Sequence, residues 1–382
     1  MKILHICLSC FYIDDQNYQE NELPRENKKQ GHDVYVLAST HINLRDGKWG
    51  FAQAGEYKTP EGVNVQRIPY HPWTPDWLGI RLRIHLGVFE ILKAIDPDVI
   101  LFHGITGWEL RTVARYKRYN PNCVVYADHH GDRLTSGSNW FTRFFLHYVY
   151  YRSVVKSCVS SFEKVLCISP MTLEYARDFY GIAEEELELY PLGGYPIEES
   201  SYASQRLLGR AKYGISENEI LIVQTGKQYK SKGLIDALRA LSEVDATNLR
   251  FIIGGVLMDD IRDDATALIA ADSRVNLLDW LDSDSLNELL CAADIYLVAG
   301  RQTATTQHAL CASCAVVLEN IVSNAPYVFG NGWLLNDPAE LASIFEEISM
   351  MRGSDLEEMQ KTSLEFAREK LDYRRLSLRY LQ

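Results

Sequence analysis

Short apolar runs bounded by turn residues recur along the chain and alternate with amphipathic stretches. The runs that we expect to be strands are residues 3–7, 34–38, 63–68, 99–102, 124–127, 164–168, 220–224, 249–253, 275–278, 295–298 and 315–318. Stretches with a helical pattern include residues 86–95, 169–179, 234–241 and 285–292. Strands that alternate with helices form parallel sheets whose two faces are both covered. The pattern therefore predicts an α/β protein.

The turn at residues 190–196, followed by the polar segment 198–206, is the best candidate for a domain boundary. A chain of 382 residues with 47% hydrophobic content is long enough for two cores of ordinary size. We therefore expect two doubly wound domains, residues 1–195 and a second domain from 196 onward. A ligand cleft is expected between the carboxyl ends of the two sheets.

Composition and charge limit the classes of molecule that the protein can be expected to bind. The net charge of -12 argues against broad nucleic-acid binding and favours a small anion bound at a local basic site. The apolar run 3–11 is too short to span a bilayer, and no later run offers the roughly 18 apolar residues that a spanning helix needs. Eight irregularly spaced cysteines are typical of a reduced cytosolic protein without disulfides.

A glycine-punctuated turn with two lysines follows the run 220–224. Gly226 and Gly233 permit a tight backbone beside a ligand, and Lys227 and Lys232 can approach one anion from opposite sides. A strand, such a turn and a helix form a phosphate grip. The alternative is an ordinary turn with two solvated lysines, because the string is not a Walker loop.

Several short pieces match one family in order along nearly the whole chain. They are residues 29–34, 97–100, 168–170 with 180–181, 190–193, and the glycine and lysine pairs at 226–227 and 232–233. Together they resemble the retaining nucleotide-sugar glycosyltransferases of the GT-B fold, of the group 1 or family 4 type, particularly bacterial enzymes that build capsule or lipopolysaccharide glycans. The resemblance implies two Rossmann-like domains that face an interdomain cleft, with residues 196–365 forming the second. It also implies a C-terminal helix, residues 366–382, that returns to the first domain.

In that family, the residues matching Lys227 and Lys232 hold the donor diphosphate, next to the glycines matching Gly226 and Gly233. Fixed cations and backbone N–H groups stabilise the negative charge that grows on a departing diphosphate. The resemblance therefore implies no cofactor and no metal, with the nucleotide sugar as substrate.

A second candidate donor site follows the run 295–298. Thr303 or Thr305 can cap a helix there, whose N–H groups give another anion site. Many relatives carry two glutamates in this segment, but Gly300 and His308 stand at those places. The candidate donor contacts are Gly300, Thr303, Thr305, Thr306, Gln307 and His308. The alternative is ordinary capping of a turn, and the identity of the donor stays open.

Paired histidines end the run 124–127. Similar enzymes place a histidine after this strand, where it contacts the donor sugar. Neighbours on a strand point to opposite faces, so only one of His129 and His130 can point inward. We expect His130 to be catalytic and His129 to lie at the cleft or to act through folding.

Other polar residues are candidates for the cleft or for acceptor contacts. Tyr18, Gln19 and Glu20 stand where the first helix should begin, and the capsule-type relatives have a similar string there. His103 follows the run 99–102. The alternative for Tyr18 to Glu20 is an ordinary helix start, in which an early Glu is favourable.

The aromatic segment 139–152 has two alternatives, a buried helix or a peripheral membrane contact. A metal site at His308, Cys311 and Cys314 is not expected, because structural zinc needs four ligands and the sequence offers no nearby fourth.

The resemblance implies a glycosyltransferase on the cytoplasmic side, and a peripheral contact with the inner membrane face stays open. It would move a sugar from a nucleotide-diphosphate donor to a glycan acceptor, lipid-linked or free, with retention. The rivals are a nucleotide-sugar 2-epimerase and a non-catalytic nucleotide-sugar-binding subunit.

Overall fold

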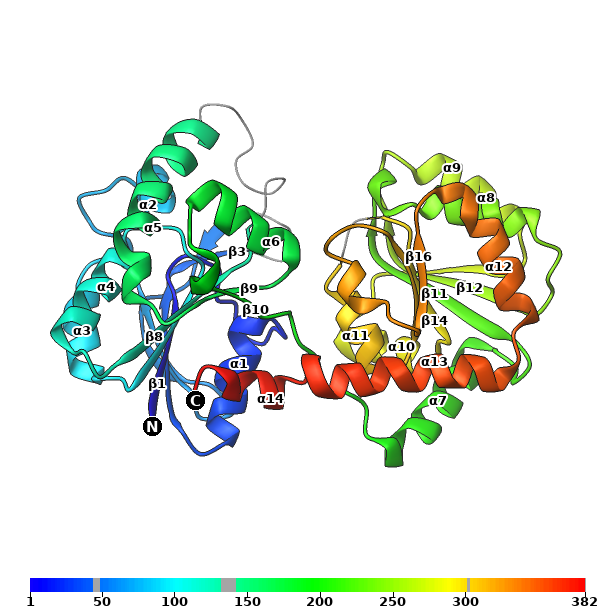
Figure 1. Ribbon diagram of the computed structural model, residues 1–382, viewed down its shortest axis with the longest axis horizontal. Helices are drawn as coiled ribbons and strands as arrows, with labels where there is room; N and C mark the ends of the chain where they lie inside the picture. The colour runs from blue at the N-terminus through cyan, green and yellow to red at the C-terminus, as the bar shows by residue number, and fades with distance from the viewer. Residues whose placement is uncertain (44–48, 132–141, 301–302, 382) are drawn as a thin grey trace. The chain divides into compact units, whose positions relative to one another are not determined.

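The chain forms two compact units in the computed structural model, which describes all residues except 44–48, 132–141, 301–302 and 382 (Figure 1). Unit 1 comprises Met1–Pro191 and Tyr373–Gln382, and unit 2 comprises Leu192–Asp372. The sequence placed the first boundary after residue 195 and the start of the returning segment at 366. Residues 367–371 stay with unit 2, because Ala367 and Leu371 are buried in its core.

Unit 1 contains an eight-stranded sheet in the order β10-β9-β8-β7-β1-β2-β6-β5. The strands are β10 (Leu187–Leu189), β9 (Val165–Cys167), β8 (Val124–His129), β7 (Val99–His103), β1 (Lys2–Cys7), β2 (Asp33–Ser39), β6 (Asn64–Ile68) and β5 (Gly55–Lys58). All neighbours are parallel except β5 and β6. A separate antiparallel pair is formed by β3 (His41–Asn43) and β4 (Trp49–Phe51).

Unit 2 contains a six-stranded sheet in the order β13-β12-β11-β14-β15-β16, and all its neighbours are parallel. The strands are β13 (Val275–Leu278), β12 (Leu249–Leu257), β11 (Ile220–Gln228), β14 (Ile295–Val298), β15 (Ala315–Glu319) and β16 (Gly332–Leu335).

Each of the eleven predicted apolar runs is a strand. The strands that were not predicted, β3, β4, β5, β10 and β16, are short and mostly exposed or half-buried, so they carry no continuous apolar run. The antiparallel edge of unit 1 departs from the prediction of purely parallel sheets. Its cause is the short connection between Lys58 and Asn64, since a parallel crossover needs about a dozen residues or more.

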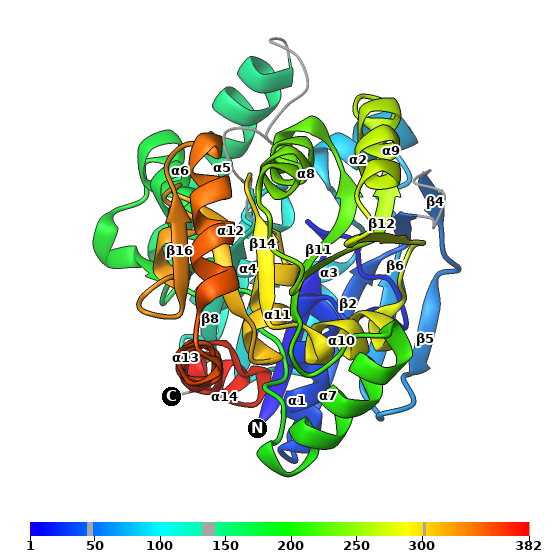
Figure 2. The ribbon, with the colours of Figure 1, turned by 90° about the vertical axis from the view of Figure 1, so that its right-hand side faces the viewer.

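Helices cover both faces of the sheet in unit 1 (Figures 1 and 2). Helices α1 (Gln19–Lys29) and α14 (Tyr373–Arg379) pack together on one face, where Leu23, Leu376 and Tyr380 are buried. The other face carries α3 (Val88–Ile95), α4 (Glu109–Tyr119), α5 (Arg152–Cys158) and α6 (Pro170–Tyr175). The π-helix η1 (Thr142–Tyr151) packs Tyr150 and Tyr151 against the same core, and Tyr150 donates to the last residue of helix α2 (Asp76–Leu82).

Unit 2 has the same layered construction. Helices α8 (Leu234–Glu243), α9 (Arg262–Ala271) and α12 (Leu341–Met350) bury apolar residues against one face of its sheet. Helices α7 (Glu199–Tyr213), α10 (Ser283–Ala292), α11 (Thr305–Cys311) and α13 (Gly353–Phe366) lie towards the other face (Figure 2). Both units are therefore Rossmann-like, as predicted.

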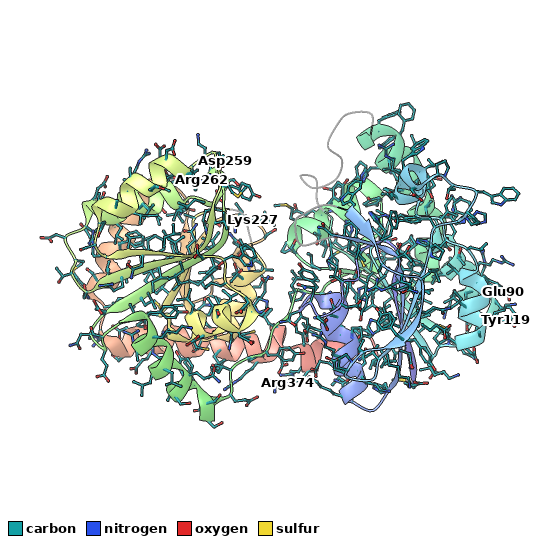
Figure 3. All side chains as sticks on the ribbon, turned by 180° about the vertical axis from the view of Figure 1, so that it is seen from behind. Glu90, Tyr119, Lys227, Asp259, Arg262 and Arg374 are labelled. Carbon is teal, nitrogen blue, oxygen red and sulfur yellow. The ribbon has the colours of Figure 1, made fainter. Side chains whose placement is uncertain are left out.

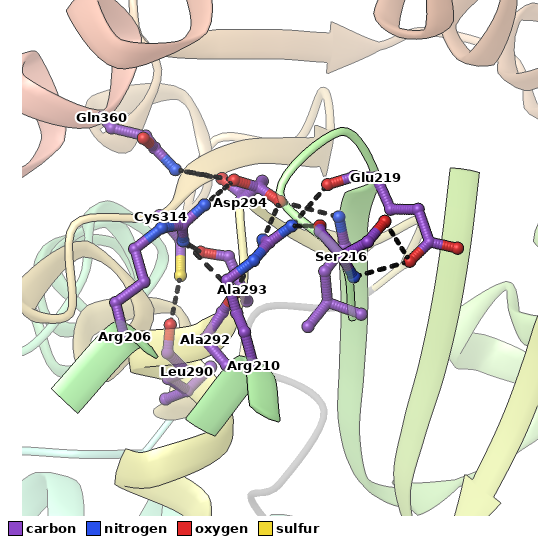
Figure 4. A network of polar contacts seen from close by, with 11 residues as sticks. Arg206, Arg210, Ser216, Glu219, Leu290, Ala292, Ala293, Asp294, Cys314 and Gln360 are labelled. Atoms are coloured by element: carbon purple, nitrogen blue, oxygen red, sulfur yellow. Dashed lines mark hydrogen bonds and ion pairs between the residues drawn. The ribbon is translucent and has the colours of Figure 1, made fainter. Parts of the chain in front are cut away.

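A buried carboxylate ties helix α7 to this sheet (Figure 4). Asp294 forms ion pairs with Arg206 and Arg210, and the Arg210 pair measures 2.9 Å. The Leu221 N–H donates to the same carboxylate at 2.7 Å, and the Gln360 amide of α13 lies at 3.4 Å. Two cations and two N–H donors offset the cost of burying this charge.

No disulfide joins the eight cysteines, all of which the structure describes. Among the helices of the described residues, none is long and apolar enough to cross a membrane.

Candidate functional site

The predicted glycine turn of unit 2 begins later than expected, because β11 continues to Gln228 and includes Gly226 and Lys227. The strand stays paired because β12 runs beside it in register, with Gly226 opposite Gly255. A Cβ at Gly255 would stand 2.1 Å from the Gly226 carbonyl oxygen. Paired glycines thus allow the two backbones to approach closely and extend the sheet.

The turn itself packs backbone to backbone against the end of β14. The short helix η5 (Lys230–Lys232) leads into Gly233, which has a φ of 68° and precedes α8. A Cβ at Gly233 would stand 2.3 Å from the Ala299 oxygen, and one at Gly300 would stand 2.1 Å from the Ser231 oxygen. Only glycine fits at either position, so the carboxyl ends of β11 and β14 form one fixed corner.

Lys232 places a cation in this corner. Its Nζ lies 3.4 Å from the Thr225 carbonyl oxygen, and a Cβ at Gly226 would stand 3.2 Å from the same nitrogen. The side chain is half-buried, and burial lowers the pKa of Lys232. In the described part of the chain, no carboxylate lies within ion-pair distance of it. A desolvated ammonium without a counter-charge favours an anionic ligand.

Lys227 has a different environment. It is exposed at the carboxyl end of β11, in the same region of unit 2 as the Asp259–Arg262 ion pair (Figure 3). Both predicted lysines therefore lie at the end of the sheet where doubly wound folds bind ligands.

Residues after β14 differ in part from prediction. Helix α11 begins at Thr305, and its N-cap is Ala304 with no side-chain cap hydrogen bond, so the prediction of a threonine cap is wrong. The Thr303 hydroxyl instead lies 3.1 Å from the Tyr296 hydroxyl, which also contacts Thr225 at 3.4 Å. Tyr296 thereby links the ends of β11 and β14.

Within α11, Thr306 and Gln307 are fully buried, and the Gln307 amide donates to the Tyr327 hydroxyl at 2.9 Å. Both side chains lie in the core of unit 2, and their contact with a donor stays a prediction. Thr305 is half-exposed and remains a candidate. His308 is half-buried against the segment at Gly194, and burial lowers its pKa.

Unit 1 brings two of the predicted histidines to one carboxylate. The register of β7 and β8 sets His103 beside Asp128, and the His103 Nδ1 lies 2.5 Å from Asp128 Oδ2. His130 follows β8, and its Nε2 lies 3.3 Å from Asp128 Oδ1. Its Nδ1 lies 3.8 Å from a Glu20 carboxylate oxygen.

Charge in this cluster favours protonated histidines. Burial opposes the charged forms, but the Asp128 carboxylate outweighs it and raises the pKa of His103 to about 10 and of His130 to about 9. The two imidazoles hold the pKa of Asp128 well below its usual range, although burial acts to raise it. The His130 side chain is 30% exposed, so it presents an imidazolium to solvent at neutral pH.

The neighbouring candidates have distinct surroundings. His129 is buried and stacks on Tyr175 with ring centroids 6.0 Å apart, which fits a role in folding. Tyr18 is exposed. Gln19 is buried, and neither of its amide atoms has a hydrogen-bond partner among the described residues. A buried amide of this kind is costly unless something else bonds it.

Outside the undescribed segments, no group of three or more His, Cys, Asp and Glu side chains is arranged to hold a metal ion. Independence from metals stays a prediction.

The carboxyl-end sites of two Rossmann-like units invite comparison with known proteins. Residues 21–193 match the sequence profile of Glycosyltransferase Family 4. The matched segment is somewhat less than half of the chain and lies almost entirely in unit 1. No curated protein sequence matches the chain.

Solved structures show the same fold over the whole chain. A glycosyltransferase from Rickettsia africae is 14% identical with a TM-score of 0.68, covering 99% of this chain and 96% of its own. WaaG, a glycosyltransferase involved in lipopolysaccharide biosynthesis, is 16% identical with a TM-score of 0.64, and the match covers 98% of this chain and 97% of WaaG. HepE from Anabaena, in complex with UDP, is 14% identical with a TM-score of 0.67, and the match covers 100% of this chain and 98% of HepE.

The chain therefore has the GT-B fold, as the sequence predicted. The family match supports glycosyl transfer in general.

Sequence reasoning missed Asp128 as a site residue. The residue stood next to the histidine pair, and its position at a strand end was a signal. Its contact with His103, however, depends on the register between β7 and β8, which an apolar pattern does not fix.

Proposed function

We propose that this chain is a retaining glycosyltransferase that moves a sugar from a nucleotide-diphosphate donor to a hydroxyl of a glycan acceptor. The observation that carries the proposal is Lys232, a half-buried ammonium with no carboxylate partner among the described residues, in a corner that only glycines can form. The fold of HepE, which was solved with UDP, is consistent with this use of the corner. The donor would bind unit 2, and the acceptor would bind unit 1.

In the transfer, the bond between the anomeric carbon and the diphosphate oxygen breaks, and the acceptor oxygen bonds to the same face of that carbon. The acceptor proton leaves with the diphosphate. Lys232, together with Lys227, would stabilise the charge on the leaving group. No metal or cofactor is part of this proposal.

His130 would serve this reaction as a hydrogen-bond donor. Because Asp128 keeps its ring protonated at neutral pH, His130 is suited to donate to a sugar or leaving-group oxygen and is not suited to act as a base. Tyr18, Gln19 and Glu20 would contribute to the acceptor side, and the unpartnered amide of Gln19 suits a sugar hydroxyl.

We assign the protein to bacterial surface polysaccharide synthesis on the cytoplasmic side of the membrane, in line with the role stated for WaaG. The exposed aromatics of unit 1 support a peripheral contact with the membrane, where a lipid-linked acceptor would lie. Phe145 and Tyr148 of η1 are exposed, and Tyr150 of η1 donates to the Leu82 carbonyl of α2, near exposed Trp77. Residues 139–141 of this segment lie outside the described residues. Aromatic side chains of this kind favour a membrane interface.

The donor site is tested by direct titration. A thermal-shift panel of UDP-, GDP- and ADP-sugars should identify one class that raises the melting temperature, because a ligand that binds only the folded state stabilises it. Lys232→Met keeps most of the side-chain bulk and removes the charge. It should weaken binding of the nucleotide diphosphate and slow transfer by about two orders of magnitude or more.

Lys230→Met is the matched control, since Lys230 is an exposed lysine of the same turn. Equal effects of the two substitutions, or unchanged donor binding by Lys232→Met, would remove Lys232 from the site. Tight donor binding by the wild-type protein without any transfer would favour a non-catalytic binding subunit. This rival is retained because Gly300 and His308 stand where many relatives carry glutamates.

The membrane contact has its own control. Trp77→Ala should reduce co-flotation with vesicles that contain phosphatidylglycerol, whereas Trp280→Ala in unit 2 should not. The two tryptophans are each 60% exposed, so equal losses would refute a specific surface on unit 1.

A further inference from the structure

A chain of buried hydrogen bonds runs from the C-terminal segment to the histidine cluster of unit 1. The Asn27 amide nitrogen donates to the Ser377 carbonyl at 3.0 Å, and its Oδ1 accepts from the Tyr380 hydroxyl at 2.7 Å. The same oxygen lies 3.0 Å from His5 Nε2. His5 Nδ1 lies 3.1 Å from His103 Nε2. His5, His103 and Asn27 are fully buried.

The first part of this chain fixes the tautomer of His5. A backbone carbonyl can only accept, so Ser377 requires the NH2 group of Asn27 on its side. Asn27 then presents its oxygen to His5, and His5 Nε2 must carry a proton. The proton at Nε2 leaves His5 Nδ1 as an acceptor whenever the ring is neutral.

The second part fixes the charge of His103. The two facing rings share a single extra proton, because both cannot donate across the 3.1 Å contact. Asp128 lies 2.5 Å from His103 and makes no contact of this kind with His5, so the proton belongs to His103. Burial and the neighbouring His103 accordingly lower the pKa of His5 to about 3. His103 then donates from both nitrogens, to His5 and to Asp128.

Two other charged groups face His103 and act in opposite directions. The Glu20 carboxylate of α1 favours the charged ring, whereas the His130 imidazolium opposes it because the two like charges share Asp128. The Gly104 N–H donates to Asp128 Oδ1 at 2.8 Å, which keeps that carboxylate ionised.

We infer that Asn27, oriented by the Ser377 carbonyl, is a positioning residue that holds His103 as an imidazolium and so limits the negative charge that Asp128 offers to His130. With His103 charged, Asp128 is already paired, and His130 feels a partly neutralised carboxylate. The Ser377 carbonyl of the C-terminal segment is then connected to His130 through four side chains, those of Asn27, His5, His103 and Asp128. This inference rests on the proposed function only where it concerns the rate of transfer.

The wild-type protein gives the first test. Long-range ¹H–¹⁵N NMR should show His5 as the neutral Nε2–H tautomer from pH 6 to 8. His103 should show two protonated nitrogens over the same range. A His5 ring protonated at Nδ1, or a His103 ring that is neutral at pH 7, would overturn the inference.

The second test compares two buried substitutions. Asn27→Leu removes the acceptor for His5 and should lower the titration midpoint of His103 by about one unit or more, with His5 no longer held in a single tautomer. Tyr190→Phe is the control, because the Tyr190 hydroxyl donates to the Leu376 carbonyl of the same C-terminal segment at 2.7 Å and takes no part in the chain of hydrogen bonds, while phenylalanine keeps the ring contact with Tyr380. His5 and His103 should be unchanged in it. Equal changes in both variants, or none in Asn27→Leu, would refute the assignment.

Activity supplies a separate readout. In Asn27→Leu, the loss of positive charge at His103 should raise the titration midpoint of His130. The fall of the transfer rate at alkaline pH should then occur at a higher pH than in the wild type. If the protein shows the predicted histidine signatures but transfers no sugar, the proposed function fails and the role of Asn27 stands. If transfer occurs and the signatures are absent, the reverse holds.

Discussion

Replacing Asp128 by asparagine tests the charge arrangement of the histidine cluster most directly. In the wild type, one carboxylate oxygen accepts from His103 and the other from the Gly104 N–H, with His130 at 3.3 Å. An asparagine amide has only one accepting oxygen. If that oxygen takes the Gly104 N–H, the NH2 group faces His103 Nδ1, which must then accept. Asp128→Asn therefore removes the charge of His103 as well as its own.

The size of the effect follows from the pKa values of the two rings. His130, whose pKa is about 9, is about 97% protonated at pH 7.5 in the wild type. Without the Asp128 carboxylate, burial lowers the pKa of His130 and the Glu20 carboxylate still raises it, so the pKa should fall towards about 6.5, which leaves about 10% of the ring protonated at that pH. Breaking a buried ion pair should also lower the free energy of unfolding by about 3 to 5 kcal/mol at pH 7.

The stability difference between the wild type and Asp128→Asn should depend on pH, and the direction of that dependence tests the charge argument. A histidine whose pKa is raised by folding stabilises the protein fully below its unfolded value and loses that contribution as the pH rises through its folded value. For His130 and His103 this loss begins near pH 6.5 and is complete at about pH 9 to 10. Asp128, whose pKa is lowered, contributes above about pH 4. The deficit of the variant should therefore be largest from about pH 4 to pH 6.5, should still be large at pH 7, and should be smaller at pH 10.

Urea unfolding at pH 7 and pH 10 measures this difference, with Asp98→Asn as the control. Asp98 is an exposed carboxylate at the opposite end of β7, bonded to the Lys2 N–H, and its substitution should cost little at either pH. An Asp128→Asn deficit of equal size at both pH values would refute the charge argument. It would leave only a loss of packing or hydrogen bonding.

Three further outcomes are expected. Gly300→Ala should lower the free energy of unfolding by about 2 kcal/mol or more and weaken donor binding, because its Cβ would lie 2.1 Å from the Ser231 oxygen. Gly353→Ala is the control, since nothing lies within 4 Å of its Cβ. It should change neither the denaturation curve nor the donor titration. Asp294→Ala should lower the free energy of unfolding by about 3 to 5 kcal/mol, since it leaves the buried Arg210 and the half-buried Arg206 without their carboxylate, and a loss below about 1 kcal/mol would contradict that account. Transfer activity should persist in a chelator such as EDTA, and a strict requirement for added magnesium or manganese would show that the lysines do not suffice.

The central strands could be predicted because they are buried on both faces and therefore appear as continuous apolar runs. β7 and β15, for example, contain runs with little exposure. β5 is exposed along its length and β10 is buried only at its first residue, so neither carries that signal. Burial, rather than strand propensity, separates the predicted strands from the missed ones.

The glycine positions of the donor corner were also accessible from sequence, although the end of β11 was not. A glycine after a strand normally indicates a turn, and here Gly226 remains paired because Gly255 stands opposite it. Which side chains of the following segment face outward could not be predicted either. Thr305 and Thr306 are the same residue type, yet only Thr306 is buried, because the position of a residue around the helix decides its exposure. The first residue of α11 could not be read from the sequence, so neither could that position.

The role of His130 shows where sequence reasoning ends. Strand alternation indicated that only one of His129 and His130 can point inward, and the choice of His130 as the catalytic residue stays a prediction. Whether it gives or takes a proton depends on Asp128, and the charge of Asp128 depends on His103. That ring is fixed through His5 and Asn27, which lie far from it in the sequence. The chemistry of one exposed imidazole is thus set by strand register and by a C-terminal carbonyl, neither of which any local motif records.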